Sequence, residues 1–268
     1  MLTGRIFLGK EGAPPYLDLY IPDHILLGRT EVRPLVLVIP GGGYRHCVAK
    51  EGEPVALAFA GKGINAAVLT YRTGEGVHYP DHLIDGAKAM DCLKRHAKKW
   101  GSDSRFVYVI GFSAGGHLAA SLATLWNKEE TIASYDCRPR AQILCYAVTL
   151  SGRYENKITY DMLAGDDEAI RSWNKLDDQV DSLTPPAFIW HTEEDQIVPV
   201  ENALLYAVAL RKGHVPFELH IYEHGPHALA LCEEFDVEDS ADADESIAGW
   251  FPLMLSWLGK DMCRVQSV

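Results

Sequence analysis

The sequence predicts an α/β fold in which a mostly parallel sheet is covered by helices on both faces. Short apolar runs alternate with amphipathic stretches along most of the chain. The runs are apolar almost throughout, as strands buried on both faces are, and such strands are joined by right-handed crossovers. The 268 residues suffice for one large domain with a substantial core. Because no repeat or low-complexity linker interrupts the pattern, we expect a single domain over residues 1–268.

The first half of the chain contains four expected strands and three expected helices. Tyr16–Pro22 alternates apolar and polar residues, which predicts an antiparallel edge strand. The other segments, in chain order, are a strand at Leu35–Pro40, a helix at Glu53–Ala60, a strand at Ala66–Tyr71, a helix at Pro80–Trp100, a strand at Val107–Ile110 and a helix from Leu118 to Trp126. The helix ending at Trp100 carries a continuous apolar stripe, and Gly101 ends it.

The second half continues the alternation. Strands are expected at Ile143–Leu150, Pro186–His191 and Phe217–Tyr222, and helices at Val200–Lys212 and Ile247–Leu258. Residues 151–185 are polar, rich in Asp and without clean periodicity. We expect them to form a small insertion over the candidate site.

The charge balance limits the kind of partner. With 25 basic and 37 acidic residues the net charge is −12, which argues against nucleic acid or an anionic membrane. A neutral or cationic small molecule fits better. No apolar run approaches the roughly 18 residues of a membrane span, and Met1–Ile6 lacks a signal-peptide core, so a cytoplasmic location is expected.

The cysteines and one acidic stretch point to no metal or cofactor. The six cysteines show no Cys-x-x-Cys spacing, so free, partly buried thiols are expected rather than a zinc site or redox pair. Eight acidic residues and no basic one lie between Glu233 and Glu245. A solvated loop is the simpler interpretation of that stretch. An acidic rim that disfavours anionic substrates is the alternative.

Gly111-Phe-Ser-Ala-Gly115 is the most informative motif in the chain. A β-branched and aromatic run precedes it and helical spacing follows it. A Gly-x-Ser-x-Gly turn between strand and helix is a nucleophile elbow, which holds its serine exposed on a sharp bend. Taken alone, the pattern could be an ordinary glycine-rich turn. Its context favours Ser113 as a nucleophile.

A serine nucleophile requires a base and an acid that orients the base. In hydrolases built on such sheets these follow the serine in the order acid, histidine, each in a loop after a strand. The loop Thr192–Pro199 offers three carboxylates, of which Asp195 is preferred because Glu193 and Glu194 are expected to face solvent.

For the base, His227 is preferred over His224 because it lies deeper in its loop, beyond a Gly-Pro pair. His117, four residues after Ser113, suits packing better than proton transfer. Acyl transfer also needs donors for the developing oxyanion. We expect the N–H of Ala114 and that of Gly42 or Gly43, since these glycines directly follow a strand. A merely flexible turn is the alternative for the triple glycine.

Together these motifs resemble the α/β-hydrolase carboxylesterases. The likeness runs from about residue 15 to 260 and is nearest to bacterial acetyl xylan and feruloyl esterase-like enzymes, related to the hormone-sensitive-lipase and dienelactone-hydrolase branches. It is carried by the segments Pro40–Tyr44, Tyr71-Arg72, Gly111–His117, His191–Pro199 and the loop of His227. Two positions depart from the pattern. Pro40 stands where the hormone-sensitive-lipase branch has histidine, and Ala228 stands where many relatives have glycine, which is expected to narrow the pocket.

The residues predict a serine carboxylesterase with a Ser113–His227–Asp195 acyl-enzyme mechanism and no cofactor or metal. The resemblance implies small acyl esters as substrates, acetyl groups on sugars or xylo-oligosaccharides among them. A small peptidase of the prolyl-oligopeptidase type is one alternative, disfavoured because the chain has no room for a large substrate-selecting domain. A non-catalytic ligand-binding protein on the same scaffold is the other, disfavoured because all three candidate residues are present.

Overall fold

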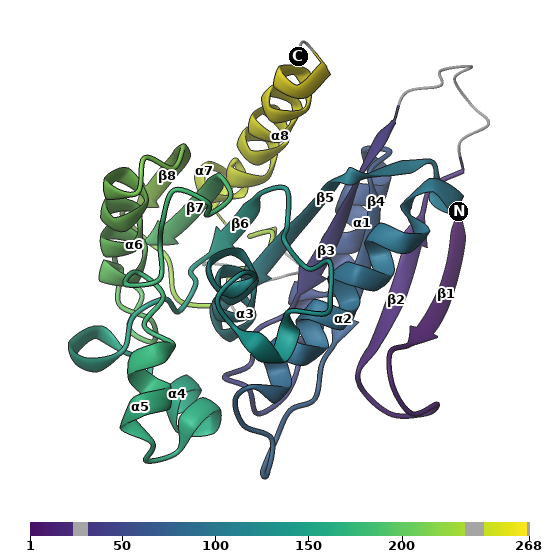
Figure 1. Cartoon of the computed structure of the whole chain (residues 1–268). Helices are drawn as coiled ribbons and strands as arrows, with labels where there is room; N and C mark the ends of the chain where they lie inside the picture. The colour runs from purple at the N-terminus through teal and green to yellow at the C-terminus, as the bar shows by residue number, and fades with distance from the viewer. Residues whose placement is uncertain (24–31, 234–243, 267–268) are drawn as a thin grey trace.

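An eight-stranded sheet forms the centre of the computed structural model, which describes residues 1–23, 32–233 and 244–266 (Figure 1). The strand order is β1-β2-β4-β3-β5-β6-β7-β8. β1 and β2 are antiparallel, as are β2 and β4, and the remaining neighbours are parallel. The strands are β1 (Leu2–Phe7), β2 (Tyr16–Ile21), β3 (Arg33–Ile39), β4 (Asn65–Thr70), β5 (Ser102–Phe112), β6 (Gln142–Cys145), β7 (Ala187–Thr192) and β8 (Phe217–Tyr222). The predicted fold class is confirmed.

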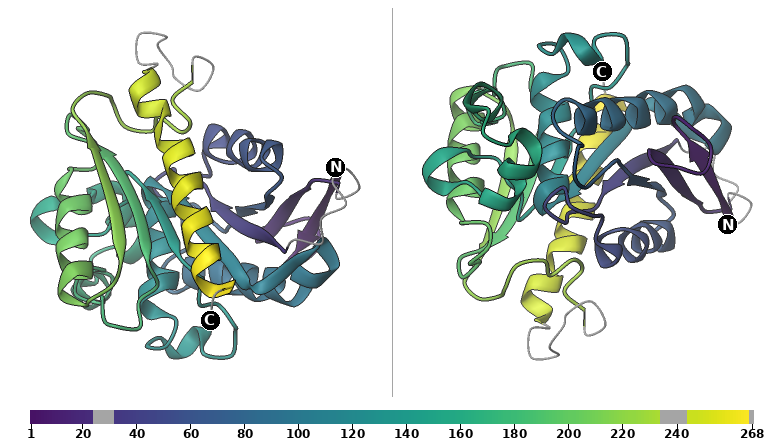
Figure 2. Two further views of the ribbon diagram at one scale, coloured as in Figure 1. Left: turned by 90° about the horizontal axis from the view of Figure 1, so that it is seen from above. Right: turned by 90° about the horizontal axis from the view of Figure 1, so that it is seen from below.

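Helices cover both faces of the sheet, and Figure 2 shows α1 and α2 on opposite sides of it. They are α1 (Glu53–Gly61), α2 (Asp81–His96), α3 (Ser113–Leu125), α4 (Lys157–Ala164), α5 (Glu168–Trp173), α6 (Glu201–Lys212), α7 (Glu245–Ala248) and α8 (Trp250–Gln266). Successive residues of one strand point to opposite faces, so β3 contributes Leu37 to the core under α2, α3 and α6 and Val38 to the core under α1 and α8. Two apolar layers therefore hold the central strands.

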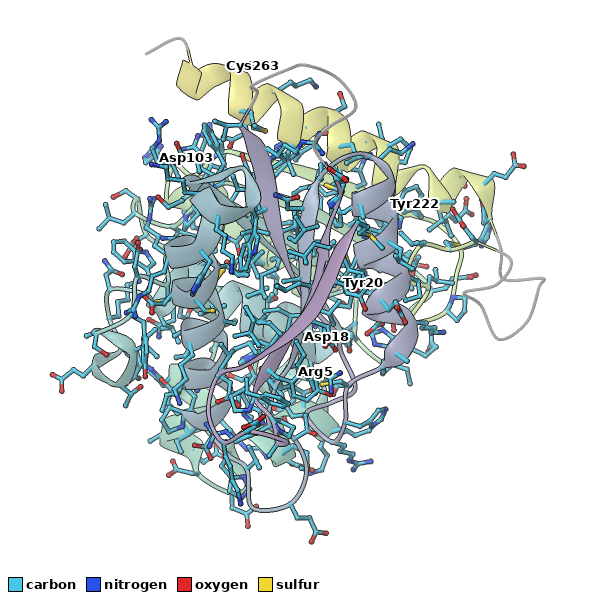
Figure 3. The ribbon with its side chains drawn as sticks, turned by 90° about the vertical axis from the view of Figure 1, so that its right-hand side faces the viewer. Arg5, Asp18, Tyr20, Asp103, Tyr222 and Cys263 are labelled. Carbon is cyan, nitrogen blue, oxygen red and sulfur yellow. The ribbon has the colours of Figure 1, made fainter. Side chains whose placement is uncertain are left out.

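The predicted edge strand is not at the edge. β1 pairs along the outer side of β2, with Arg5 opposite Asp18. Their side chains form an ion pair, with Arg5 Nε 2.7 Å from Asp18 Oδ1 (Figure 3). Four of the six β1 residues are exposed. Without a buried face, β1 has no alternating pattern for sequence reasoning to detect.

The helix predicted to end at Trp100 is present as α2, followed by a 3₁₀ turn, η2 (Ala97–Trp100). Gly101 then adopts φ 69° and ends the turn. That left-handed conformation is the one in which glycine commonly terminates helices. The apolar stripe of this segment faces the core, as predicted.

The predicted strand Ile143–Leu150 is too long, because β6 ends at Cys145. Tyr146 adopts φ 37°, which turns the chain out of the sheet. The rest of the apolar run is buried as a loop whose backbone is satisfied elsewhere. Val148 N–H donates to Ser113 O, and the N–H groups of Thr149 and Leu150 donate to Asn202 Oδ1.

The chain after β6 is more helical than its sequence pattern indicated. Within residues 151–185 lie the 3₁₀ turn η4 (Gly152–Tyr154), α4 and α5. Asn156 and Asp167 cap the two helices by accepting backbone N–H groups. The predicted helix at Ile247–Leu258 is instead α7 and α8, separated by Gly249.

Within the part of the chain that the structure describes, no helix is long and apolar enough to cross a membrane. Within the described ranges the six cysteines form no disulfide: three are buried, two are half-buried and Cys263 is exposed. Most of the acidic stretch, residues 234–243, lies outside the described residues.

Candidate active site

Ser113 lies at the sharp bend between β5 and α3. β5 is one of the middle strands of the sheet (Figure 1). The φ of Ser113, 52°, is the strained left-handed conformation of an elbow. The bend fits only because its neighbours lack side chains. A Cβ atom on Gly111 would lie 2.2 Å from Gly115 O, and one on Gly115 would lie 2.2 Å from Ile39 O. The glycines of the motif thus bring helix and strands into contact around the serine.

His227 and Asp195 continue from Ser113 as a chain of hydrogen bonds. His227 Nε2 lies 2.8 Å from Ser113 Oγ, and His227 Nδ1 lies 2.6 Å from Asp195 Oδ2. The other oxygen of Asp195 accepts the backbone N–H groups of Ile197 and Val198. Burial alone would raise the pKa of Asp195. The hydrogen bond from His227, the charge of that ring and the hydrogen bond from the Val198 N–H together outweigh burial and hold the pKa below its usual range. The carboxylate is therefore kept ionised and aimed at the imidazole.

Within the described residues, the side chains of the alternative candidates for the acid and the base form no hydrogen bond with the Ser113 hydroxyl. Glu193 and Glu194 are exposed, and Glu194 Oε1 is 3.2 Å from the ring of His224, whose side chain is 67% exposed. His117 is fully buried, and its Nδ1 lies 2.8 Å from Tyr44 Oη. Burial lowers the pKa of His117 to about 4, which keeps the ring neutral. The structure thus brings Asp195 and His227, and none of these alternatives, to the serine.

The triple glycine after β3 lies against the elbow. A Cβ atom on Gly41 would be 2.9 Å from Ser113 Cβ, so only glycine permits this approach. Gly42 adopts φ 120° and Gly43 adopts φ 61°. Across the described residues, the N–H groups of Gly42 and Gly43 have no protein acceptor. The N–H of Ala114, in the first turn of α3, has no intrahelical partner either, so all three donors are available to a ligand.

The segment 151–185 reaches this loop through α4. The Ile158 side chain, 40% exposed, lies within 2.9 Å of the position that a Cβ on Gly43 would occupy. Asn156, at the start of α4, donates from Nδ2 to Ile197 O, just after Asp195. An apolar side chain therefore stands beside the glycine loop, and α4 is tied to the loop that carries the acid.

Two residues that sequence reasoning missed also belong to this region. Glu51 and Tyr146 are both buried, and the Tyr146 hydroxyl donates to Glu51 Oε1 at 2.8 Å. A glutamate between Lys50 and Gly52 gives no sign of burial in the sequence. Tyr146 lies within the apolar run Ile143–Leu150, whose pattern predicts a strand and not a polar contact.

The site coincides with neither of two sizeable hollows on the described part of the protein. Among the residues in the described ranges, no group of three or more His, Cys, Asp or Glu side chains could hold a metal ion. A hollow of about 860 Å³ is lined by residues between Lys94 and Arg140, and one of about 680 Å³ lies between α1 and α8. Neither is lined by Ser113, Asp195 or His227. The site is therefore defined by the hydrogen bonds that join Ser113, His227 and Asp195.

Comparison with known proteins identifies the family. Residues 17–149 match the BD-FAE family. The chain is 37% identical over 228 residues to endo-1,4-beta-xylanase B of Butyrivibrio fibrisolvens, covering 81% of this chain and 34% of that protein. It is 29% identical over 215 residues to the acetylxylan esterase of Xylanibacter ruminicola, covering 76% and 42%. The chain thus spans between a third and a half of the length of these relatives.

A solved structure matches over nearly its whole length. It is the acetyl ester-xyloside bifunctional hydrolase from Caldicellulosiruptor lactoaceticus, 34% identical with a TM-score of 0.78, covering 94% of this chain and 96% of that one. The resemblance drawn from the sequence motifs is confirmed. With the elbow on the central strand and this similarity across almost the entire fold, the chain belongs to the α/β-hydrolase family, among its carboxylesterases and acetylxylan esterase-like members.

Proposed function

We propose that this chain is a serine carboxylesterase that hydrolyses small acyl esters. The observation that carries the proposal is the hydrogen-bonded series from Ser113 Oγ through His227 to Asp195, with distances of 2.8 and 2.6 Å. A nucleophile, a base within reach of its proton and a carboxylate that orients the base are what acyl transfer requires. Family membership supports the same conclusion, because the relatives named above include esterases.

The reaction proceeds through a covalent acyl-enzyme. Ser113 Oγ attacks the ester carbonyl while His227 Nε2 takes the hydroxyl proton, and Asp195 stabilises the imidazolium that forms. The carbonyl oxygen becomes negative and accepts N–H groups of Ala114 and of Gly42 or Gly43. When the intermediate collapses, the C–O bond to the alcohol breaks and His227 returns the proton to the leaving oxygen. Water, deprotonated by His227, then releases the acid and restores Ser113.

Acetyl esters of sugars, xylo-oligosaccharides among them, are the substrate class that we propose. Two relatives are named for acetyl ester or acetylxylan chemistry, which supports the choice. Ile158 beside Gly43 provides a small apolar contact near the oxyanion donors, suited to a short acyl group. The net charge of −12 is compatible with a neutral carbohydrate and unfavourable for an anionic substrate.

Replacing Ser113 by Ala tests the mechanism. We expect turnover of p-nitrophenyl acetate to fall by about four orders of magnitude or more, with a small remnant from the oxyanion donors. Ser121→Ala is the matched control, because Ser121 is also buried on α3 but its hydroxyl donates to His117 O. That control should keep its rate. If Ser113→Ala retains more than a tenth of the wild-type rate, Ser113 is not the nucleophile.

A substrate panel tests the proposed class. Initial rates on acetyl, butyryl and feruloyl esters and on acetylated xylo-oligosaccharides should favour the acetyl compounds. Faster hydrolysis of an aminoacyl-prolyl amide would indicate a peptidase instead. A well-folded protein that turns over no ester and is not labelled at Ser113 by a fluorophosphonate would indicate a binding protein.

A further inference from the structure

A buried carboxylate lies directly behind the glycine loop. Glu51, at the end of the 3₁₀ turn η1 (Ala49–Glu51), is only 1% exposed. Its Oε2 accepts the backbone N–H of Gly41 at 2.7 Å, and its Oε1 accepts the hydroxyl of Tyr146 at 2.8 Å. One side chain thus holds the first glycine of the loop and a tyrosine from the end of β6.

Tyr146 extends this connection to the loop that carries His227. Its hydroxyl oxygen accepts the backbone N–H of Ala230 at 2.9 Å, three residues beyond the histidine. Its ring stands edge-on to the His227 ring, with centroids 5.0 Å apart and an interplanar angle of 69°. Ala228 and Ala230 adopt φ values of 64° and 52°, so this loop holds a strained backbone that needs external restraint.

A contribution to stability alone does not explain why the Glu51 carboxylate is buried. No lysine, arginine or histidine within the described ranges comes within salt-bridge distance of Glu51. Burial raises the pKa of Glu51, opposed by the hydrogen bonds of Tyr146 and Gly41. A buried carboxylate without a cationic partner is unfavourable compared with an apolar residue of similar size. Its two hydrogen bonds reach the two loops that flank Ser113, which indicates a role in arranging them.

We propose that Glu51 and Tyr146 are positioning residues that hold the glycine loop and the histidine loop in the mutual arrangement acyl transfer requires. Gly41 lies against Ser113 Cβ, so fixing its N–H sets where the N–H groups of Gly42 and Gly43 point. The same pair of side chains restrains the loop that presents His227 to Ser113. The inference rests on the proposed function, in which both loops act on one substrate carbonyl.

Three variants of the full chain test the inference: Glu51→Gln, Glu51→Ala and Tyr146→Phe. Misplacing a catalytic group by about 1 Å can lower a rate about a hundredfold. We therefore expect Tyr146→Phe and Glu51→Gln to lower kcat for p-nitrophenyl acetate by about tenfold to a hundredfold, with KM changed less than about threefold. Glu51→Gln should retain more activity than Glu51→Ala, because the amide oxygen can still accept the Gly41 N–H.

A second tyrosine–carboxylate pair provides the matched control. The Tyr108 hydroxyl donates to Asp261 Oδ2 at 2.9 Å, and both residues are buried. Tyr108 lies on β5 five residues before Ser113, about 16 Å away along an extended strand. Tyr108→Phe removes the same hydroxyl from the same kind of pair. It should lower the melting temperature without changing kcat.

Every rate is normalised to the concentration of sites that a fluorophosphonate labels, so unfolded protein does not count. If Glu51→Gln and Tyr146→Phe lower only the melting temperature and keep the wild-type kcat per labelled site, the pair is merely structural and the inference is overturned. If Glu51→Gln fails to fold, the milder Tyr146→Phe decides. Should Ser113→Ala remain active, or wild-type protein resist labelling at Ser113, the proposed function fails instead, and the two failures are distinct.

Discussion

Two buried tyrosine–carboxylate pairs, Tyr146–Glu51 beside Ser113 and Tyr108–Asp261 farther back along β5, differ in how the carboxylate is satisfied. Asp261 accepts the Tyr108 hydroxyl and two further hydrogen bonds from Arg140, each 2.8 Å long. Glu51 accepts the Tyr146 hydroxyl and the backbone N–H of Gly41. One charge is matched by a guanidinium and the other only by neutral donors.

The difference separates a contact that stabilises the fold from one that arranges a site. An ion pair with a forked guanidinium satisfies a carboxylate well and joins α8 to the sheet. Backbone and hydroxyl donors satisfy Glu51 less completely but specify where two loops lie. Changes at the Tyr146–Glu51 pair should therefore lower kcat with little loss of stability, and changes at the Tyr108–Asp261 pair should do the reverse.

The largest expected effect in this comparison is that of Asp195→Asn. The amide cannot hold the imidazole in the correct tautomer or stabilise its charged form, so kcat should fall about 10³- to 10⁴-fold. Steady-state kinetics with p-nitrophenyl acetate measure this. Glu194→Gln, in the same loop but exposed, is the control and should keep the wild-type rate. Equal losses in both variants would show that the loop, rather than the Asp195 carboxylate, matters.

The pH dependence of stability gives an independent check on Asp195. Its pKa is lower in the folded chain than in the unfolded one, where an aspartate has a pKa of about 3.9. Its contribution to the free energy of unfolding is therefore fully present above that value and is lost as the pH falls through the lower folded pKa. The difference in melting temperature between wild type and Asp195→Asn should be constant near neutrality and change only in strong acid.

A smaller loss of activity is expected for Gly42→Ala. Gly42 adopts φ 120°, and an added Cβ would lie 2.2 Å from His46 O, so the loop must shift. Losing one well-placed oxyanion donor lowers kcat about 10²-fold. Gly12→Ala has a comparable φ of 82° but open space around the new methyl group. Gly12→Ala should lower the stability somewhat and leave the activity unchanged. A kcat for Gly42→Ala within threefold of wild type would exclude this loop from the oxyanion site.

The smallest effect on activity is expected for Arg140→Gln, which removes the cation from the Tyr108–Asp261 pair. Of the three hydrogen bonds to the buried Asp261 carboxylate named above, removing the guanidinium leaves only the one from the Tyr108 hydroxyl. Because the Arg140 side chain is 30% exposed, solvent screens the loss, and about 1–2 kcal/mol is expected. The melting temperature should fall by about 2–8 °C with kcat unchanged. A drop in kcat per labelled site would contradict the difference in role between the two pairs.

The parts of the fold and site that depend on local pattern could be predicted from the sequence. The elbow around Ser113 is a contiguous motif, and the loops of Asp195 and His227 each follow an apolar strand in the expected order. The structure brings these side chains within hydrogen-bond distance of one another.

The parts that depend on tertiary contacts could not be predicted. β1 lies on the exposed side of β2, so burial leaves no pattern in its residues. The positive φ of Tyr146 ends β6 at Cys145. The hydroxyl of Tyr146 donates to Glu51, which is 95 residues away in the sequence. Glu51 is a charged residue whose burial arises only when β3, β6 and the histidine loop meet.

The sequence separations in the site have a consequence for how the chain folds. The bond between His227 and Ser113 spans 114 residues, and that between Tyr146 and Glu51 spans 95. Contacts this distant form late, because the intervening chain must first lose its conformational freedom. Helical content can return during refolding long before these bonds close. Recovery of reactivity at Ser113 therefore marks completion of the whole topology, and a chain ending before residue 227 would be silent in that assay.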